Sequence, residues 1–405
     1  MHITIVSYTF PPSNGIGGRR WAKFSQELSK LGHEVTVVCA NKSVPKNWYE
    51  KDYGGIDFKL LPKFYPGWLR GYTKSILEKI CYLVTIKVIS HLTKENIFDG
   101  GIGWRKPMLN VLEGIHKQKM IDVLIVTGAP FSLLYYGAEF KRRHKEVFYV
   151  TDFRDPWTWG SYYGIPALSN CKRKHQETSE NEAMLFSNLV CVPTDHMGDF
   201  LKGKYPDCKS KLYVLSHAYN PEKFPPVSTE VKREGFIYGG TLYAGIEEYM
   251  EKLLKVVRLN PKSGFKWDIY TGANSPLLES DIEQTGIKKH TFIPEEQLFQ
   301  KIGNSAAYLA IYPPADKDLV STKFFEIIHS KTPILYIGEE GEVGKFIRKS
   351  RAGIHILPEN IERDLPQYLN GKVPFEEGFF DVSQYTFSSV TEKFVSEINR
   401  RRRNN

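Results

Sequence analysis

The sequence predicts an α/β protein made of two doubly wound domains, each with a parallel sheet. Three observations support this prediction. Short apolar runs alternate with helical stretches from end to end, the rhythm restarts after a Pro-rich stretch at 220–226, and 405 residues exceed what one hydrophobic core usually supports. In such folds the ligand crevice lies at the carboxyl ends of the strands, so we expect two domains facing each other across a cleft.

The predicted strands are short apolar runs bounded by polar or glycine-containing turns. In the first half they fall at 2–8, 34–39, 122–127, 147–152 and 189–192, with a helix over 19–31 after the first. In the second half they fall at 235–238, 267–271, 291–293, 308–312, 334–337 and 353–357. We therefore expect a first domain at 1–220, a second at 221–380, and a C-terminal helix with a basic tail at 381–405 that returns to the first domain.

The stretch 68–92 is typical of a helix with many apolar positions. Its charged residues Glu78, Lys79 and Lys87 interrupt it too often for a membrane span, which needs about 20 mostly apolar residues. Two interpretations remain open: a helix of the core, or an amphipathic surface that dips into a membrane interface.

Much of the formal net charge of +9 is spread along the chain, but basic residues are locally concentrated at 141–145, 172–175 and 400–403. No helix-turn-helix, zinc-finger or RNA-binding pattern accompanies these clusters, so we expect an anionic membrane surface or a pyrophosphate substrate as the partner and no nucleic acid. Solvated surface charge is the alternative.

The five cysteines are odd in number, scattered and never spaced as CxxC, and the chain opens on a strand rather than a signal peptide. Reduced thiols in the cytoplasm are the simplest account, with peripheral association at the inner face of the cell membrane as a further expectation. No His or Cys pair has the spacing of metal ligands, so neither a metal nor a cofactor is expected.

The run 320–335 carries the strongest functional signal. It predicts a helix that starts at Ser321 or Thr322 and places Lys323 and Glu326 on the first turn. Free amide groups and the helix dipole hold a phosphate at such a position, Lys323 adds a full charge, and Glu326 can accept hydrogen bonds from sugar hydroxyls.

A purely structural role for Glu326 is the alternative. A capping box would place the acid three residues after Ser or Thr, where Phe324 and Phe325 stand, so capping is disfavoured. A favourable interaction with the helix dipole alone remains open.

The first strand leads into a glycine-rich turn, SNGIGGRRW at 13–21, just before a helix. Its glycines allow close backbone approach and leave amides pointing into the crevice. A dinucleotide-binding fingerprint would need glycine where Arg20 stands, and GxxxxGK[ST] does not occur. A Rossmann dehydrogenase and P-loop phosphoryl transfer are therefore disfavoured.

Two further polar turns follow predicted strands: TGAPFS at 127–132 and DFRDPW at 152–157. In the second, Arg154 stands between Asp152 and Asp155, so either an internal Arg–Asp pair shapes the loop or the turn contacts a substrate. Loops at the carboxyl ends of parallel strands are where chemistry concentrates, which favours a substrate role for at least one turn.

Five motifs, PPxxGxGGxR, GAPFS, DFRDPW, YGGTLY and STKFFE, occur in this order. Together they resemble family 4 glycosyltransferases of the GT-B fold, most closely the branch that builds bacterial surface polysaccharides. The resemblance covers nearly the whole chain. It implies two Rossmann-like domains and a retaining, metal-independent, hexosyltransferase-type enzyme. The donor would be a nucleotide diphosphate sugar carrying UDP or GDP, and we expect a lipid-linked or other saccharide acceptor.

The resemblance also implies roles for particular residues. Glu326 would grip the ribose hydroxyls, and Lys323 would face the diphosphate. The full donor set is Gly17, Gly18, Gly240, Thr241, Asp318, Ser321, Thr322, Lys323 and Glu326. On the acceptor side we assign Arg19, Ser132, Arg154 and Trp157, and the expected catalytic residues are Asp155, Arg154 and Lys323.

Two departures from the family pattern bear on these roles. Asp318 stands where the first Glu of an ExxxxxxxE pattern is usual, and the basic pair that often follows the GG turn is replaced by YAGIEE at 243–248. Lys323 is then the main positive charge expected beside the diphosphate. A sugar nucleotide epimerase on the same two-domain plan and a non-catalytic binding or scaffold protein are the alternatives.

Overall fold

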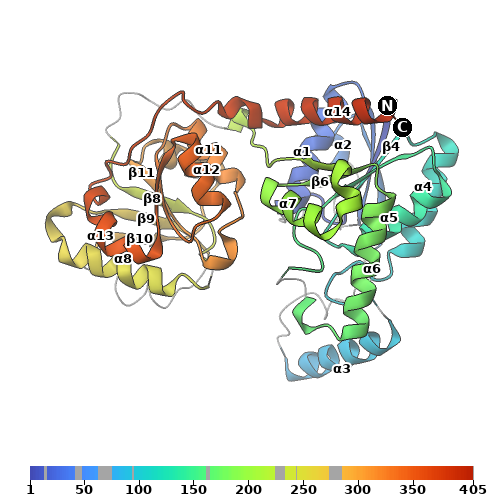
Figure 1. The fold of residues 1–405 in the computed structure, drawn as a ribbon, viewed down its shortest axis with the longest axis horizontal. Coiled ribbons are helices and arrows are strands. Elements are labelled where there is room, and N and C mark those ends of the chain that lie inside the picture. Colours follow the sequence, from blue (N-terminus) through green and yellow to red (C-terminus); the bar gives the residue numbers. More distant parts are fainter. Residues whose placement is uncertain are drawn as a thin grey trace. The chain divides into compact units, whose positions relative to one another are not determined.

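The computed structural model describes residues 1–12, 16–41, 48–62, 75–93, 95–160, 165–223, 233–242, 244–272 and 285–404. The chain divides into two compact units. Unit 1 comprises Met1–Ser216 together with Val390–Asn405, and unit 2 comprises His217–Ser389. The predicted boundaries followed residues 220 and 380. Each unit is an α/β layer structure in which helices flank a sheet (Figure 1).

The sheet of unit 1 has seven strands, all parallel, in the order β3-β2-β1-β4-β5-β6-β7. Its strands are β1 (His2–Val6), β2 (Glu34–Ala40), β3 (Ile56–Leu61), β4 (Val123–Thr127), β5 (Phe148–Asp152), β6 (Leu189–Val192) and β7 (Leu212–Val214). Every residue of β1, β4, β5 and β6 is buried, as expected for a parallel sheet covered on both faces.

The helices of unit 1 connect these strands. They are α1 (Ile16–Lys30), α2 (Trp48–Asp52), α3 (Ile76–Leu92), α4 (Arg105–Gln118), α5 (Ser132–Arg143), α6 (Asn170–Phe186) and α7 (Asp195–Lys204). The chain builds strands outward from β1 to β3 and then, from β4 on, in the opposite direction. The loops after β1 and β4 therefore diverge, and this topological switch point is the expected ligand position.

Unit 2 repeats the plan with a six-stranded parallel sheet in the order β10-β9-β8-β11-β12-β13. Its strands are β8 (Phe236–Gly239), β9 (Trp267–Tyr270), β10 (Ile287–His290), β11 (Ala307–Ile311), β12 (Ile334–Ile337) and β13 (Gly353–Ile356). Its helices are α8 (Glu247–Leu259), α10 (Glu295–Gly303), α11 (Thr322–His329), α12 (Glu342–Ser350) and α13 (Ile361–Asp364). The switch point lies between β8 and β11.

Three strands differ from the prediction. The segments β3 and β7 were not predicted, and the predicted strand at 291–293 lies instead at Ile287–His290. Each is an edge strand or carries polar residues, with the sequences IDFKLL, LYV and IKKH. Charged residues interrupt β3 and β10, and β7 has only three residues, so none of the three shows the longer apolar run that marks a central strand.

The last helix, α14 (Phe387–Arg403), crosses from unit 2 into unit 1. Phe394 and Ile398 are fully buried there, and the Phe394 ring contacts Trp21 with a centroid separation of 6.3 Å. The Arg402 guanidinium pairs with Asp122 at 2.8 Å. The C-terminal helix is thus part of the core of unit 1.

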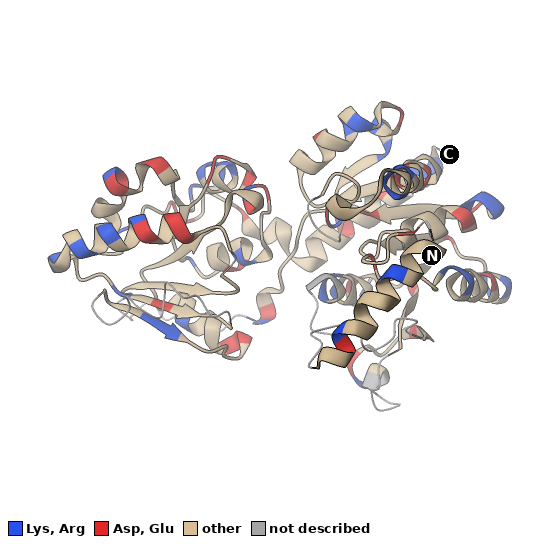
Figure 2. Cartoon of the chain, turned by 90° about the horizontal axis from the view of Figure 1, so that it is seen from below, with Lys and Arg blue, Asp and Glu red and all other residues tan. Residues whose placement is uncertain are grey.

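Two of the three basic clusters found in the sequence contain residues that bond to partners within unit 1. In the first, Arg142 pairs with Glu182 and Lys141 donates to the Val147 carbonyl at 2.7 Å. In the tail, Arg401 donates to the Ser210 carbonyl at 2.7 Å. Figure 2 shows blue and red residues interspersed over both units. Part of the positive charge of these clusters is therefore compensated by acidic or carbonyl partners within unit 1.

Helix α3 is the exception to the burial of apolar side chains. None of its residues is buried, although it is the most apolar helix of unit 1. Its exposed large apolar side chains are Ile76, Leu77, Ile80, Leu83, Val84, Val88 and Leu92. It is not a core helix, and residues 68–74 of the predicted stretch lie outside the described residues. Among the helices described here, none combines the length and apolarity needed to cross a bilayer.

Candidate functional site

The first turn of α11 is built as the sequence predicted. Ser321 is the N-cap residue, and its hydroxyl accepts the Lys323 amide N–H at 3.3 Å. Phe324 and Phe325 turn inward and are buried, which anchors the helix. Ser321, Thr322 and Lys323 remain half-buried, so the positive end of the helix dipole is open to a ligand.

Lys323 joins α11 to the glycine turn that follows β8. Its ammonium group donates a hydrogen bond to the Gly239 carbonyl at 2.5 Å. Gly240 has φ +155°, and a Cβ there would lie 2.4 Å from the Lys323 Nζ atom. Strands β8 and β11 are neighbours, so the two loops that meet here are those of the switch point. Burial lowers the pKa of Lys323.

Two tyrosines hold the glycine turn in place. The Tyr308 hydroxyl donates to the Gly239 carbonyl at 3.1 Å and accepts the Gly239 N–H at 3.3 Å. The Tyr238 hydroxyl donates to the Thr241 carbonyl at 2.8 Å, while the Thr241 residue itself is exposed. The tyrosine hydroxyls therefore fix the backbone of the turn on one side, while Thr241 is accessible to solvent. Tyr243, which follows it, lies outside the described residues.

Glu326 lies one turn along the same helix. Its side chain is half-buried, yet no described residue forms a hydrogen bond or ion pair with its carboxylate. Burial, helped by the negative charge of Glu295, raises the pKa of Glu326 to about 7. Lys223 pairs with Glu295 at 2.5 Å and so neutralises part of that charge. A half-buried carboxylate without a protein partner is well suited to accept hydrogen bonds from ligand hydroxyls.

Asp318 lies in the loop between β11 and α11. One of its carboxylate oxygens accepts the Glu342 amide N–H at 3.0 Å and so caps the start of α12. A Cβ on Gly341 would lie 2.8 Å from the same oxygen. The short Asp side chain thus links the loop to the next helix.

In unit 1, the glycine pair of the first turn begins α1. Gly17 and Gly18 lie in the first helical turn, directly after the loop that follows β1. A Cβ on Gly18 would lie 2.6 Å from the Thr9 carbonyl oxygen, so only glycine lets the helix pack this closely against the loop. Arg19 is exposed, whereas Arg20 is buried and donates to the Leu215 carbonyl at 2.6 Å.

Arg154 connects the two polar turns of unit 1. Its guanidinium donates to the Gly128 carbonyl and, at 3.1 Å, to the Ala129 carbonyl. The DFRDPW turn after β5 is therefore tied to the TGAP turn after β4. These bonds of Arg154 lead to the neighbouring loop, and the Arg–Asp pair within one loop that the sequence left open stays a prediction. Asp155 is half-buried beside it.

Ser132 and Trp157, which the sequence assigned to the acceptor side, are buried. The Ser132 hydroxyl donates to Asp99 at 2.7 Å, and Ser132 is 8% exposed. Trp157 is 1% exposed, stacks on Phe131 at 5.4 Å and donates its indole N–H to Gln176. Both side chains support the turns from within.

Two acids hold this geometry through contacts that were not predicted from the sequence. Asp99 accepts hydrogen bonds from the Phe131 and Ser132 amides and so caps α5. Asp152 is fully buried and accepts the Trp21 indole N–H at 2.6 Å. An acid before two glycines, as at 99–101, is the local signal for the first. Asp152 bonds to Trp21, which lies 131 residues away in sequence, so no local pattern could indicate this role of Asp152.

Comparisons with known proteins identify the fold. No family model and no curated protein matches the chain in sequence. Among solved structures, a glycosyltransferase from Rickettsia africae ESF-5 matches over 100% of both chains at 12% identity and TM-score 0.62. The lipopolysaccharide outer core galactosyltransferase WaaB in its apo form matches over 99% of both chains at 12% identity and TM-score 0.60. A putative UDP-N-acetylglucosamine 2-epimerase from Listeria monocytogenes covers 100% of this chain and 97% of its own, at 12% identity and TM-score 0.56.

At this level of identity the likeness concerns the fold. The chain has the GT-B fold, and the prediction of two Rossmann-like parallel-sheet domains is confirmed. In chemical terms, the described part of unit 2 offers at its switch point a helix N-terminus, the Lys323 ammonium group and the Glu326 carboxylate, which has no hydrogen-bond or ion-pair partner among the described residues. That set can bind a phosphate and a pair of hydroxyls on one molecule.

Proposed function

We propose that this protein is a retaining glycosyltransferase of the family 4 type that transfers a sugar from a nucleotide diphosphate sugar to a saccharide acceptor. The observation that carries the proposal is that Lys323 and Glu326 lie one turn apart on α11 at the switch point of unit 2. The Lys323 ammonium group suits the diphosphate, and the Glu326 carboxylate suits the ribose hydroxyls. The donor base would be uracil or guanine, and the transferred sugar a hexose.

The donor would be held by unit 2 through charge and backbone dipoles. The Glu326 carboxylate would accept hydrogen bonds from the ribose. Lys323, with the Ser321–Thr322 helix start and the Gly240–Thr241 turn, would hold the diphosphate. An ammonium group offers three N–H donors and only one is used for Gly239, so Lys323 can bind the turn and an anion together. Asp318 would approach the donor from the loop between β11 and α11.

Unit 1 would supply the acceptor side. Arg19, Arg154 and Asp155 are the proposed contacts, and the amides of Gly17 and Gly18 would approach the phosphates or the transferred sugar. Ser132 and Trp157 would act by holding the two turns in shape, because both side chains are buried. Asp155 would orient the acceptor hydroxyl.

In the proposed reaction, the bond between the anomeric carbon and the β-phosphate oxygen breaks first, and the electron pair leaves on the phosphate. The acceptor hydroxyl attacks from the face that the phosphate vacates, and its proton passes to a phosphate oxygen. Negative charge grows on the leaving phosphate, where Lys323 and the helix dipole stabilise it. This chemistry would retain the anomeric configuration and would not require a metal ion.

The acceptor is proposed to be lipid-linked, with the protein acting in the cytoplasm at the inner face of the membrane. Helix α3 supports this proposal, because Leu77 is 75% exposed and Leu92 81% exposed. Side chains of this kind are stable in contact with acyl chains, and Lys79 and Lys87 on the same helix would suit anionic head groups.

The decisive experiment is to follow a radiolabelled sugar. Transfer of label from a nucleotide sugar to a lipid or saccharide fraction is expected. Appearance of a new free nucleotide sugar would instead indicate an epimerase, the alternative that the Listeria neighbour favours. Failure to bind UDP, GDP or ADP in calorimetry would exclude both enzymes and leave a non-catalytic scaffold.

A further inference from the structure

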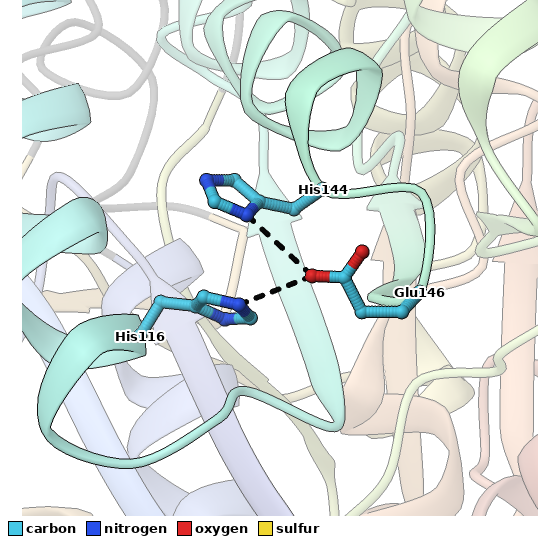
Figure 3. Close-up of side chains that lie close together, drawn as sticks. All are labelled: His116, His144 and Glu146. Atoms are coloured by element: carbon cyan, nitrogen blue, oxygen red, sulfur yellow. Dashed lines mark ion pairs between the residues drawn. The ribbon is translucent and has the colours of Figure 1, made fainter.

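Two histidines and a glutamate from separate parts of unit 1 converge at one point (Figure 3). His116 lies in the last turn of α4, His144 is the C-cap residue of α5, and Glu146 lies in the turn that leads to β5. Both rings point toward the Glu146 carboxylate. The His116 Nε2 atom is 3.1 Å, and the His144 Nδ1 atom 3.5 Å, from the same oxygen of Glu146.

This cluster is separate from the proposed transfer site. Helices α4 and α5 each end where β4 and β5 begin, so their C-terminal turns lie at the amino ends of the strands. The turns that carry Gly128 and Arg154 lie at the carboxyl ends. The sheet therefore separates the cluster from the sugar chemistry.

We propose that His116, His144 and Glu146 bind a divalent transition-metal ion, with Zn²⁺ as the best fit, and that the ion clamps α4 to α5. Ligands bound tetrahedrally at about 2.0–2.2 Å lie roughly 3.3–3.5 Å from one another. The two separations from the Glu146 oxygen are close to that value, and all three ligand atoms lie within 4.8 Å of one another. Two imidazoles and one carboxylate suit zinc rather than magnesium or calcium.

A second carboxylate orients His144 as metal sites require. The His144 Nε2 atom lies 3.0 Å from Glu113, so the ring can donate its proton there. With the ring proton on Nε2, the Nδ1 lone pair faces the Glu146 oxygen at 3.5 Å, and a cation bound between them would be attracted to both. Histidine ligands of metals commonly donate their other ring N–H to a carboxylate in this way.

The site is preorganised yet accessible. The His116 and His144 rings lie 4.4 Å apart between centroids, and Phe140 packs against both. Their side chains are 14% and 21% exposed, whereas Glu146 is 51% exposed. An ion can enter on the Glu146 side, and water can fill the fourth coordination position.

Metal binding changes one hydrogen bond, which provides a marker. The His116 Nδ1 atom now accepts the Ile121 amide N–H at 3.2 Å, so the single proton of the neutral ring is on Nε2. When Nε2 binds the ion, that proton moves to Nδ1, and the Ile121 amide must release the ring. The Ile121 amide resonance should therefore shift on zinc addition.

The test is zinc titration of the untagged full chain, followed by calorimetry and thermal unfolding. We expect one Zn²⁺ per chain, a rise in the unfolding temperature, and no such rise with Mg²⁺ at the same concentration. His144→Ala should abolish binding, and Glu113→Gln should weaken it about 10- to 100-fold, because it removes only the carboxylate that orients the ring. Co²⁺ should give the intense visible bands of a tetrahedral site.

His290→Ala is the matched control. His290 also faces a carboxylate, with its Nε2 atom 2.6 Å from Asp268, but it lies outside the cluster. Zinc binding that His290→Ala leaves unchanged and His144→Ala removes supports the site. No binding by the wild-type chain, or binding that survives His144→Ala, overturns it. Because this readout is independent of sugar transfer, the outcome does not depend on the proposed function.

Discussion

The sharpest prediction concerns Glu326 and the pH dependence of nucleotide binding. Ribose hydroxyls donate hydrogen bonds to the ionised carboxylate, so the nucleotide selects the ionised form. With a pKa of about 7 in the empty protein, roughly nine-tenths of Glu326 is ionised at pH 8 and one-tenth at pH 6. The apparent dissociation constant scales inversely with the competent fraction, so affinity should fall about tenfold from pH 8 to pH 6.

Glu326→Gln isolates this effect. The variant keeps the shape but loses the charge, so at pH 8 it should bind a nucleoside diphosphate roughly 10- to 150-fold more weakly, the value of one charge-assisted hydrogen bond. At pH 6 the wild-type carboxyl is mostly protonated, so the difference between the two proteins should shrink about tenfold. The terminal phosphate of the ligand also titrates near pH 6, but it does so equally for both proteins.

Glu326 should affect the stability of the empty protein in the opposite direction: nucleotide affinity rises with pH, whereas stability falls. The fold raises the pKa of Glu326 from 4.5 to about 7, so it favours the protonated form, and the stability this provides is complete below pH 4.5 and is lost as the pH rises through 7. At pH 8 the loss is up to about 3 kcal/mol. Glu326→Gln should therefore unfold at a higher temperature than wild type at pH 8 and at the same temperature near pH 4.5.

Calorimetry at pH 6 and pH 8 and thermal unfolding without ligand measure both effects. Parallel pH profiles for wild type and Glu326→Gln would refute the ribose role of Glu326. Equal unfolding temperatures at pH 8 would refute the raised pKa and, with it, the argument from burial.

Three further predictions follow from single contacts. Lys323→Ala should lower the affinity for a nucleoside diphosphate at least about tenfold and leave the affinity for the nucleoside almost unchanged, as measured by calorimetry. Equal losses of affinity for both ligands would contradict the diphosphate role of Lys323. Leu77→Glu should reduce co-sedimentation with anionic liposomes, whereas Leu259→Glu, which changes a leucine of similar exposure on α8, should not; a wild-type dimer that Leu77→Glu dissociates would instead assign α3 to contact between copies. Gly18→Ala should destabilise unit 1 by about 1–3 kcal/mol, because its Cβ meets the Thr9 backbone, whereas Gly114→Ala, whose Cβ meets nothing within 4 Å, should be neutral or stabilising.

Much of the fold could be predicted because the central strands are continuous apolar runs, and the start of α11 could be predicted because Ser321 is a strong N-cap residue. Both features are local. The edge strand β10 was displaced in the prediction because IKKH has no apolar run to mark it.

Features that depend on contacts distant in sequence could not be predicted. The bonds from Arg154 to the Gly128 and Ala129 carbonyls join loops about 25 residues apart, and the pairing of His116 with Glu146 joins a helix to a turn. The sequence also shows basic clusters for which we expected an anionic partner, whereas Arg142 and Arg402 have acidic partners within the fold. The raised pKa of Glu326 depends on burial, which the pattern of one helix does not report.

The return of α14 to unit 1 has a consequence for how the protein is made. Unit 1 needs Phe394 and Ile398 to complete its core, but the ribosome supplies them only after all of unit 2 has emerged. At 5–20 residues per second, the delay is roughly ten seconds or more. During that time the surface around Trp21 that Phe394 will cover is open, so the nascent chain passes through a stage in which chaperone binding is favoured, and a fragment ending at Ser216 would remain in that state.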